Sequence, residues 1–206
     1  MKIIDTYKRG EEMSWLYHTL KDYGLFAAVP IAAAAAAIYA VIRVTYLKAS
    51  HKPRAAMSAE VARGLLVWYL VILIVLVWLP ELPRLLFGKI TLEEFAALTF
   101  LPGEYGNNGR FLLLLGGDFS VLRDEELIGN IVLFVPYGAL LAVSFRRLRW
   151  WAVGLIGLGT TLLIELVQPL LERSCDLDDI IANTLGTLVG YAAAKLTLKA
   201  VSAARK

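Results

Sequence analysis

Residues Gly64 to Pro80 read GLLVWYLVILIVLVWLP, a run that contains no charged side chain. The hydrocarbon core of a bilayer is about 30 Å thick, and an α-helix needs about 20 mostly apolar residues to cross it. This run is close to that length, and Pro80 and Pro83 are expected to end its helix. Over the whole chain, 58% of the residues are hydrophobic, 19% are charged and the mean hydropathy is +0.63. These values exclude a water-soluble domain and indicate an integral membrane protein.

Four further stretches between charged residues are also long and apolar enough to be spanning helices. The predicted spans are Tyr23–Ile42, Gly64–Pro80, Leu127–Phe145, Trp150–Leu171 and Asp178–Lys195. Alternation of apolar and polar residues with period two is not sustained, so a transmembrane β-barrel is not expected. We therefore predict an all-α fold, a polytopic bundle of about five transmembrane helices.

Two segments outside these spans differ from them in character. Residues 1–22 mix charged residues with Trp15, Leu16 and Leu20, which is typical of an amphipathic helix at the membrane interface. Residues 81–126 form the longest loop, and the apolar piece Phe111–Leu115 within it is too short to cross. We interpret that piece as interfacial or re-entrant. The chain thus divides into the segment 1–22, two spans in 23–80, the loop 81–126, and a core of three spans with a tail in 127–206.

The positions of Lys and Arg predict how the spans are oriented, because cytoplasmic loops carry an excess of basic residues. Three segments on one side are basic, with Lys48, Lys52, Arg54 and Arg63 after the first span, Arg146, Arg147 and Arg149 after the third, and Lys195, Lys199, Arg205 and Lys206 in the tail. We expect that side to be cytoplasmic and the N-terminus to lie outside, although basic residues within 1–22 oppose this bias. The turn before Trp150 and Trp151 is typical of a membrane anchor with an aromatic belt, not of a nucleic-acid site.

Polar residues gather near the far end of the fourth span. Glu165 is followed by Gln168, Arg173, Asp176, Asp178, Asp179 and Asn183, while the flanking sequence is almost purely apolar. A helix rises 1.5 Å per residue, so Glu165 lies roughly 22 Å from Trp150, close to the opposite membrane face. The fifth span begins at that face, and so does the third, with Asn130 just inside. We therefore expect a pocket at this face between three helices.

The same residues carry a family resemblance. Residues 127–195 resemble the VanZ-like family of bacterial membrane proteins. The resemblance is carried by three pieces of sequence: the segment from Gly129-Asn130 to Pro136-Tyr-Gly138, the pair Glu165 and Gln168, and the run from Arg173 through Asp176, Asp178, Asp179 and Asn183 to Gly186 and Gly190. It implies a multi-pass protein of the bacterial cytoplasmic membrane with a role in the cell envelope. It also implies a link to glycopeptide resistance of the teicoplanin type, without a defined reaction.

Three interpretations of the polar cluster remain open from the sequence. In the first, the cluster is structural: Glu165, Gln168, Arg173 and Asn183 form a polar network that joins the fourth and fifth spans. Asp176 is then the N-cap and Asp179 the N3 residue of the last span. In the second, Arg173 receives an anionic group, Glu165 and Asp179 act as catalytic acid or base, and Asn130, Gln168, Asp176, Asp178 and Asn183 contact the ligand. In the third, hard oxygen ligands for Mg²⁺ or Ca²⁺ come from Glu165, Asp176, Asp178 and Asp179.

Three residues of the core are expected to shape helix packing. Gly186 and Gly190 form a GxxxG pair that allows close approach of a neighbouring helix. Pro136 removes a backbone donor inside the third span and is expected to kink it. Cys175 is the single cysteine, so the chain has no internal disulfide.

Two classes of function follow from these observations. In the first, the pocket binds a lipid-linked cell-wall precursor or an amphiphilic glycopeptide, and membrane lipids are the other partners. In the second, the protein is a membrane-embedded enzyme that acts on a polyprenyl or phospholipid phosphate. The sequence does not decide whether a reaction occurs, which cofactor it would use, or what the oligomeric state is.

Overall fold

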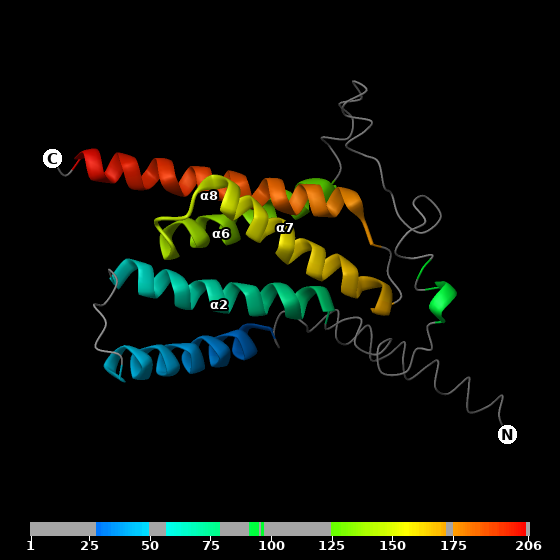
Figure 1. Ribbon diagram of the computed structural model, residues 1–206, viewed down its shortest axis with the longest axis horizontal. Coiled ribbons are helices and arrows are strands. Elements are labelled where there is room, and N and C mark those ends of the chain that lie inside the picture. The colour runs from blue at the N-terminus through cyan, green and yellow to red at the C-terminus, as the bar shows by residue number, and fades with distance from the viewer. Residues whose placement is uncertain are drawn as a thin grey trace.

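A computed structural model describes residues 28–49, 57–78, 91–94, 96, 125–171 and 175–204 of the chain. Every regular element in these ranges is a helix, which confirms the predicted all-α class (Figure 1). The interfacial segment 1–22 and the piece Phe111–Leu115 lie outside the described residues. Within the long loop, Thr91 and Glu94 form a capping box that begins a short helical turn. The hydrogen bonds that Thr91 donates hold the pKa of the Glu94 carboxyl below its usual value.

Four helices in the described part of the chain are long and apolar enough to cross a membrane. They are Ala28–Ala49, α2 (Met57–Trp78), α6 (Glu125–Ser144), and α7 (Trp150–Val167) with the short 3₁₀ helix η3 (Gln168–Leu171) that continues it. The fifth predicted span is α8 (Leu177–Ala204), which is the longest of the labelled helices but less apolar than the other four. Its polar residues include the buried Asp178, Asn183 and Thr187 near its start and the exposed Thr197 and Lys199 toward its end.

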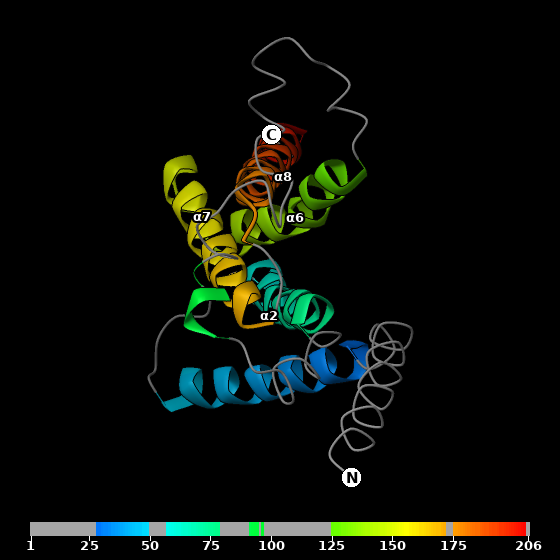
Figure 2. The same ribbon diagram turned by 90° about the vertical axis from the view of Figure 1, so that its right-hand side faces the viewer.

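Helix α8 packs against both α6 and α7. Helix α6 also packs against α2 (Figure 2). The helix Ala28–Ala49 joins the outer side of α2, where Ala28 and Ala32 are buried with Ile72. The main apolar core lies between α2, α6 and α7, and it contains Leu66, Leu73, Phe134, Tyr137, Leu141, Val153 and Ile164.

Glycines allow α6 and α8 to touch backbone to backbone. A Cβ atom on Gly186 would overlap the carbonyl oxygen of Ile131, and one on Gly190 would overlap the carbonyl oxygen of Val135. From the other side, a Cβ on Gly138 of α6 would overlap the carbonyl oxygen of Thr187 on α8. Since lipid offers no hydrophobic force between helices, close packing of this kind contributes to helix association in a membrane together with hydrogen bonds between helices.

Helix α6 continues unbroken through Pro136. Proline supplies no amide proton to the preceding turn, so carbonyl groups there need another donor in the absence of water. The hydroxyl of Tyr69 on α2 donates to the carbonyl of Leu133, one turn before the proline. This bond fixes α2 on α6 next to the Val132 carbonyl, which is the group that loses its α-helical amide partner at Pro136.

The first two helices contain charged residues that the sequence prediction placed outside the spans. Helix α2 begins at Met57, well before the predicted Gly64, and the first helix extends to Ala49, beyond the predicted Ile42. Arg43 forms a fork on Glu60, with Nε to Oε2 and Nη2 to Oε1 both at 3.1 Å, and Arg63 Nη1 lies 2.6 Å from Glu60 Oε1. Because the three charges pair with one another, the helices can continue through them.

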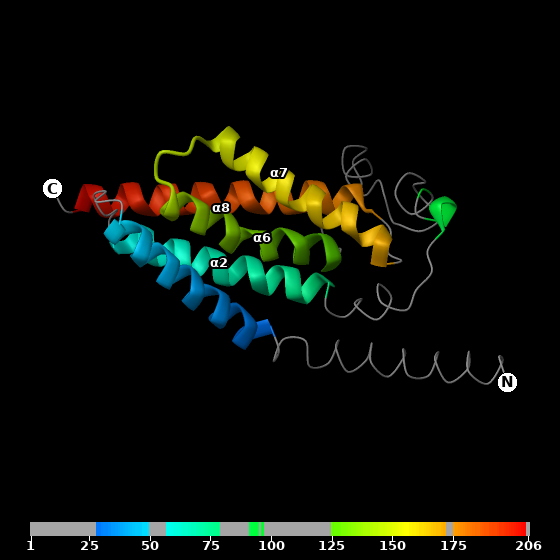
Figure 3. The same ribbon diagram turned by 60° about the horizontal axis from the view of Figure 1, so that its bottom comes forward.

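The end of the first helix, the start of α2, the turn between α6 and α7 and the end of α8 lie at one end of the bundle (Figure 3). The Arg146 guanidinium donates to the Ser58 hydroxyl at the start of α2, at 2.9 Å. The Lys195 ammonium near the end of α8 donates to the Arg146 carbonyl at 2.6 Å, and the Tyr191 hydroxyl donates to the Leu148 carbonyl at 2.9 Å. The turn between α6 and α7 is thereby fastened to both neighbouring helices.

The glycine contact yields a test of the packing. We expect Gly190→Ala to lower the free energy of unfolding by about 1–3 kcal/mol, because the new methyl group meets a backbone carbonyl that cannot rotate away. Unfolding of the detergent-solubilised protein by a denaturing detergent would measure it. Gly159→Ala is the matched control, since a Cβ there meets nothing within 4 Å. Equal stability of the two variants would contradict the assigned contact.

Candidate functional site

Glu165, in the last turn of α7, is a buried carboxylate with only 1% of its surface exposed. Its Oε1 accepts a hydrogen bond from Gln168 Nε2 at 2.9 Å, and its Oε2 accepts one from the backbone N–H of Asp176 at 3.0 Å. A buried carboxylate is tolerated when it is paired or fully hydrogen-bonded. Glu165 therefore ties the end of α7 to the segment that leads into α8.

The short connection between α7 and α8 has a defined backbone conformation where it leaves α7 and where it enters α8. Pro169 lacks an amide proton, so the α-helical pattern ends at Val167 and the chain continues as η3. At the start of α8, Asp176 Oδ1 accepts from the backbone N–H of Asp178 at 2.8 Å. Asp176 is thus the N-cap of α8, with Asp178 and Asp179 in the first turn, where negative charge is favourable.

A second link joins the beginning of α6 to the beginning of α8. The side-chain amide of Asn130 donates to Asp179 Oδ1 at 2.6 Å. Both residues are partly exposed, whereas Asp178 next to them is buried. The amide and the carboxylate therefore form the rim of the cluster, and Glu165, Gln168 and Asp178 form its interior.

A separate hydrogen-bonded group lies further along α7 and α8 from this end. Asn183 Nδ2 donates to Thr161 Oγ1 on α7 at 2.9 Å, and Thr187 Oγ1 donates to the Asn183 carbonyl at 2.9 Å. All three side chains are buried. Sequence reasoning did not single out Thr161 or Thr187, although each has a visible signal. Thr161 lies one helical turn before Glu165, and Thr187 lies one turn after Asn183, so each shares a helix face with a predicted site residue.

The structure brings together most of the residues that the sequence assigned to this site. They form three hydrogen-bonded groups at one end of α6, α7 and α8, and these contain Asn130 with Asp179, Glu165 with Gln168, Asp176 and Asp178, and Asn183 with Thr161. Arg173 lies outside the described residues, so its place in the cluster stays a prediction. Gly186 and Gly190 lie on α8 just below the cluster, where they set its distance from α6.

The carboxylates of the cluster do not form a cation cage. Within the described ranges, no group of three or more His, Cys, Asp or Glu side chains is placed to hold a metal ion. The Asp176 and Glu165 oxygens face backbone and amide donors instead. The interpretation with Mg²⁺ or Ca²⁺ therefore receives no support from this geometry.

Cys175 reports on the electrostatics of the cluster. Its partial burial raises the pKa of its thiol, and the negative charges of Glu165 and Asp176 raise that pKa further. A raised pKa keeps the thiol protonated at neutral pH, where a thiolate would be needed for nucleophilic chemistry. The raised pKa therefore does not favour nucleophilic chemistry at Cys175.

The arrangement defines a class of protein, a multi-pass helical membrane protein with a hydrogen-bonded carboxylate and amide cluster at one end of three helices. A family model described as VanZ/LLP1 matches residues 66–198. The chain belongs to the VanZ/LLP1 family, as the sequence resemblance predicted. It is thus a VanZ-like membrane protein, and its family is linked to glycopeptide resistance.

Comparison with individual proteins gives the same placement. Protein VanZ of Enterococcus faecium is 27% identical to this chain over 135 residues, which are 65% of this chain and 73% of that protein. No solved structure matches the chain. The family match extends the resemblance seen in residues 127–195 toward the N-terminus and includes most of α2, whose Tyr69 hydroxyl binds α6.

The thiol provides a direct test of the buried charge. We expect alkylation of Cys175 to be slow at neutral pH and to accelerate only at a pH above that of an ordinary thiol, because its pKa is raised. In Glu165→Gln one negative charge is gone, so the pKa falls and the rate profile moves to lower pH. The rate of reaction with iodoacetamide between pH 7 and pH 10 measures this shift.

Glu125→Gln is the control for the alkylation profile. It removes a carboxylate from an exposed position at the start of α6, outside the groups that act on Cys175. Its profile should superimpose on that of the wild type. An unshifted profile in Glu165→Gln would show that the carboxylate does not act on the thiol.

Proposed function

We propose that this chain is a bacterial cytoplasmic-membrane protein that contributes to glycopeptide resistance of the teicoplanin type by binding an amphiphilic ligand at its polar cluster. The ligand is a lipid-linked cell-wall precursor or the lipoglycopeptide itself. The basic turn, the start of α2 and the end of α8 lie at the other end of the bundle, and basic segments favour the cytoplasm. The polar cluster then faces the extracytoplasmic side, where both ligands occur.

The observation that carries this proposal is the two-layered build of the cluster. The interior carboxylate of Glu165 is locked by chain donors, while the Asn130–Asp179 pair and Asp176 remain partly exposed at the rim. A rim of oxygen acceptors held by a rigid interior suits the hydroxyl, amide and amine donors of a glycan or peptide headgroup. The buried side chains thus hold the partly exposed ones in place, and the partly exposed ones contact the ligand.

The surroundings of the rim suit the apolar part of an amphiphile. Leu163, Leu166 and Leu170 on α7 and η3 are exposed, and so is Leu177 at the start of α8. In a membrane these side chains face acyl chains next to the polar cluster. A ligand with a lipid tail can therefore lie along this surface while its headgroup reaches the rim.

The geometry supports binding over catalysis at this site. A general base needs an oxygen that can reach a proton on the substrate. Both oxygens of Glu165 accept hydrogen bonds from the chain itself, and the residue is almost fully buried. Asp179 is at the rim but already accepts from Asn130. An enzyme acting on polyprenyl or phospholipid phosphates would have to open these bonds during each turnover.

Resistance measurements on variants test the proposal. In a teicoplanin-sensitive host that expresses this chain, we expect Asp179→Ala and Asn130→Ala to lower the minimal inhibitory concentration to that of the host alone. We expect Asp179→Asn to retain most of the resistance, because the amide oxygen can still accept from Asn130. Immunoblotting of membranes controls for accumulation, and Glu125→Ala is the matched removal of a carboxylate outside the cluster.

The outcomes separate the two functional classes. Full resistance from a well-accumulated Asp179→Ala variant would contradict ligand binding at the rim. Loss of resistance in both Asp179→Asn and Glu165→Gln, at normal accumulation, would favour an enzyme that depends on carboxylate charge. Native mass spectrometry then asks whether wild type carries a lipid-linked precursor that Asp179→Ala has lost.

A further inference from the structure

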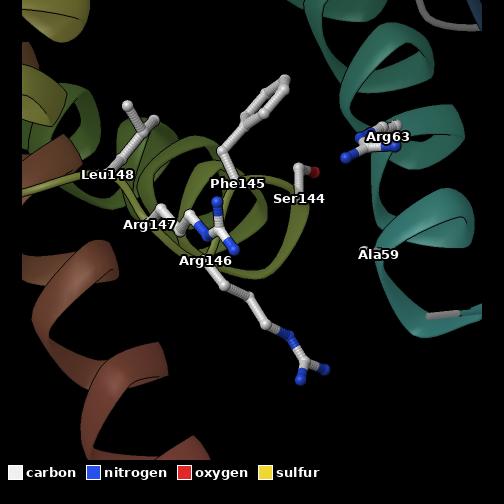
Figure 4. Close-up of a pocket in the computed structure, with 7 residues that line it drawn as sticks. All are labelled: Ala59, Arg63, Ser144, Phe145, Arg146, Arg147 and Leu148. Atoms are coloured by element: carbon white, nitrogen blue, oxygen red, sulfur yellow. The ribbon is translucent and has the colours of Figure 1, made fainter. Parts of the chain in front are cut away.

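A second site lies at the opposite end of the bundle, between α2 and the turn after α6. A pocket of about 460 Å³ is lined there by Ala59, Arg63, Ser144, Phe145, Arg146, Arg147 and Leu148 (Figure 4). Three of these residues are arginines, contributed by two segments far apart in the sequence. The polar cluster of the proposed function contributes no residue to this pocket.

Two polar atoms of this pocket are buried without a hydrogen-bond partner. They are Arg63 Nε and Ser144 Oγ. Within the described residues, four buried side-chain N or O atoms in all lack a partner, and these are two of them. Ser144 is 2% exposed, and Figure 4 shows its hydroxyl and the Arg63 guanidinium pointing toward one another across the gap between α6 and α2. Leaving a buried donor unpaired is unfavourable, so this pair of donors is suited to a bound acceptor.

The charge around the pocket selects an anion. Arg63, Arg146 and Arg147 contribute positive charge, and Lys195 binds the Arg146 carbonyl nearby. The acidic residue beside Arg63 is Glu60, which already binds both Arg43 and Arg63. Arg63 uses Nη1 for that ion pair, so its Nε remains available for a second acceptor. The site therefore retains a net positive charge after the internal pairing.

We propose that this pocket binds a phosphate group, with Arg63 Nε, Ser144 Oγ and the Arg147 guanidinium as its donors. Guanidinium groups match the tetrahedral oxygens of phosphate through charge-assisted hydrogen bonds, and a hydroxyl adds a neutral donor. The turn lies at the end of membrane-spanning helices, where the headgroup of an anionic phospholipid such as phosphatidylglycerol supplies this chemistry. Soluble phosphate has the same chemistry, and the experiment below separates the two sources.

The test compares lipid retention by variants of the full chain. Protein purified in mild detergent is mixed with phosphatidylglycerol or phosphatidylcholine, and bound lipid is counted by native mass spectrometry. We expect wild type to retain phosphatidylglycerol selectively, and Arg147→Ala to weaken its binding about tenfold or more through loss of a charge-assisted bond. Ser144→Ala should weaken binding less and should not lower thermal stability, because its hydroxyl has no partner within the described chain.

Arg149→Ala is the matched control for charge. Arg149 belongs to the same basic turn, but it lies over the ring of Trp151 and does not line the pocket. Retention should match that of the wild type. An equal loss in Arg149→Ala and Arg147→Ala would overturn the site, because any charge on the turn would then suffice.

A second arm identifies the source of the phosphate. Inorganic phosphate is titrated into lipid-free protein, and into protein that carries phosphatidylglycerol. Selective lipid binding that inorganic phosphate does not displace supports a headgroup site. Binding of inorganic phosphate that is lost in Arg147→Ala supports a site for a soluble phosphate. Absence of both, or retention unchanged in Arg147→Ala, would overturn the proposal without affecting the resistance tests on the polar cluster.

Discussion

The contact between the backbones of α6 and α8 is the constraint on which the rest of the structure depends. Gly138, Gly186 and Gly190 bring the two helices so close that carbonyl groups of one occupy the space of missing side chains on the other. At this separation the short side chain of Asn130 reaches Asp179. Close backbones also permit Cα–H to carbonyl contacts, which recur at helix interfaces. The glycines thus determine where the polar groups at the end of α8 can find partners.

The second constraint is the absence of water from the hydrocarbon. Each polar group inside the bundle needs a partner from the protein, and the structure provides it across helices in several places. The Tyr69 hydroxyl donates to the Leu133 carbonyl, and the Asn183 side-chain amide donates to the Thr161 hydroxyl. The Tyr137 hydroxyl lies 2.8 Å from Thr160 Oγ1. These bonds hold α2 and α7 on the pair formed by α6 and α8. The bundle therefore combines close apolar packing with specific polar links.

The sequence predicted the fold class and the meeting of Asn130, Glu165 and Asp179 at one end, because helical rise and loop positions determine depth in the membrane. Depth does not determine which side chains become partners. That Asn130 binds Asp179, and that Glu165 binds the Asp176 backbone, depends on how each helix is rotated. Thr161 was missed because threonine often bonds within its own helix and then carries no tertiary information. The early start of α2 was missed because Glu60 is neutralised by Arg43 of another helix.

The pairing of Arg43, Glu60 and Arg63 bears on how the chain enters the membrane. These charges lie near the connected ends of the first two helices, and together they carry a single net positive charge when paired. An isolated arginine or glutamate is poorly accepted by the bilayer, whereas a paired group enters at lower cost. The two helices are therefore suited to enter the bilayer as one hairpin, because the ion pairs lower the cost of burying each charge.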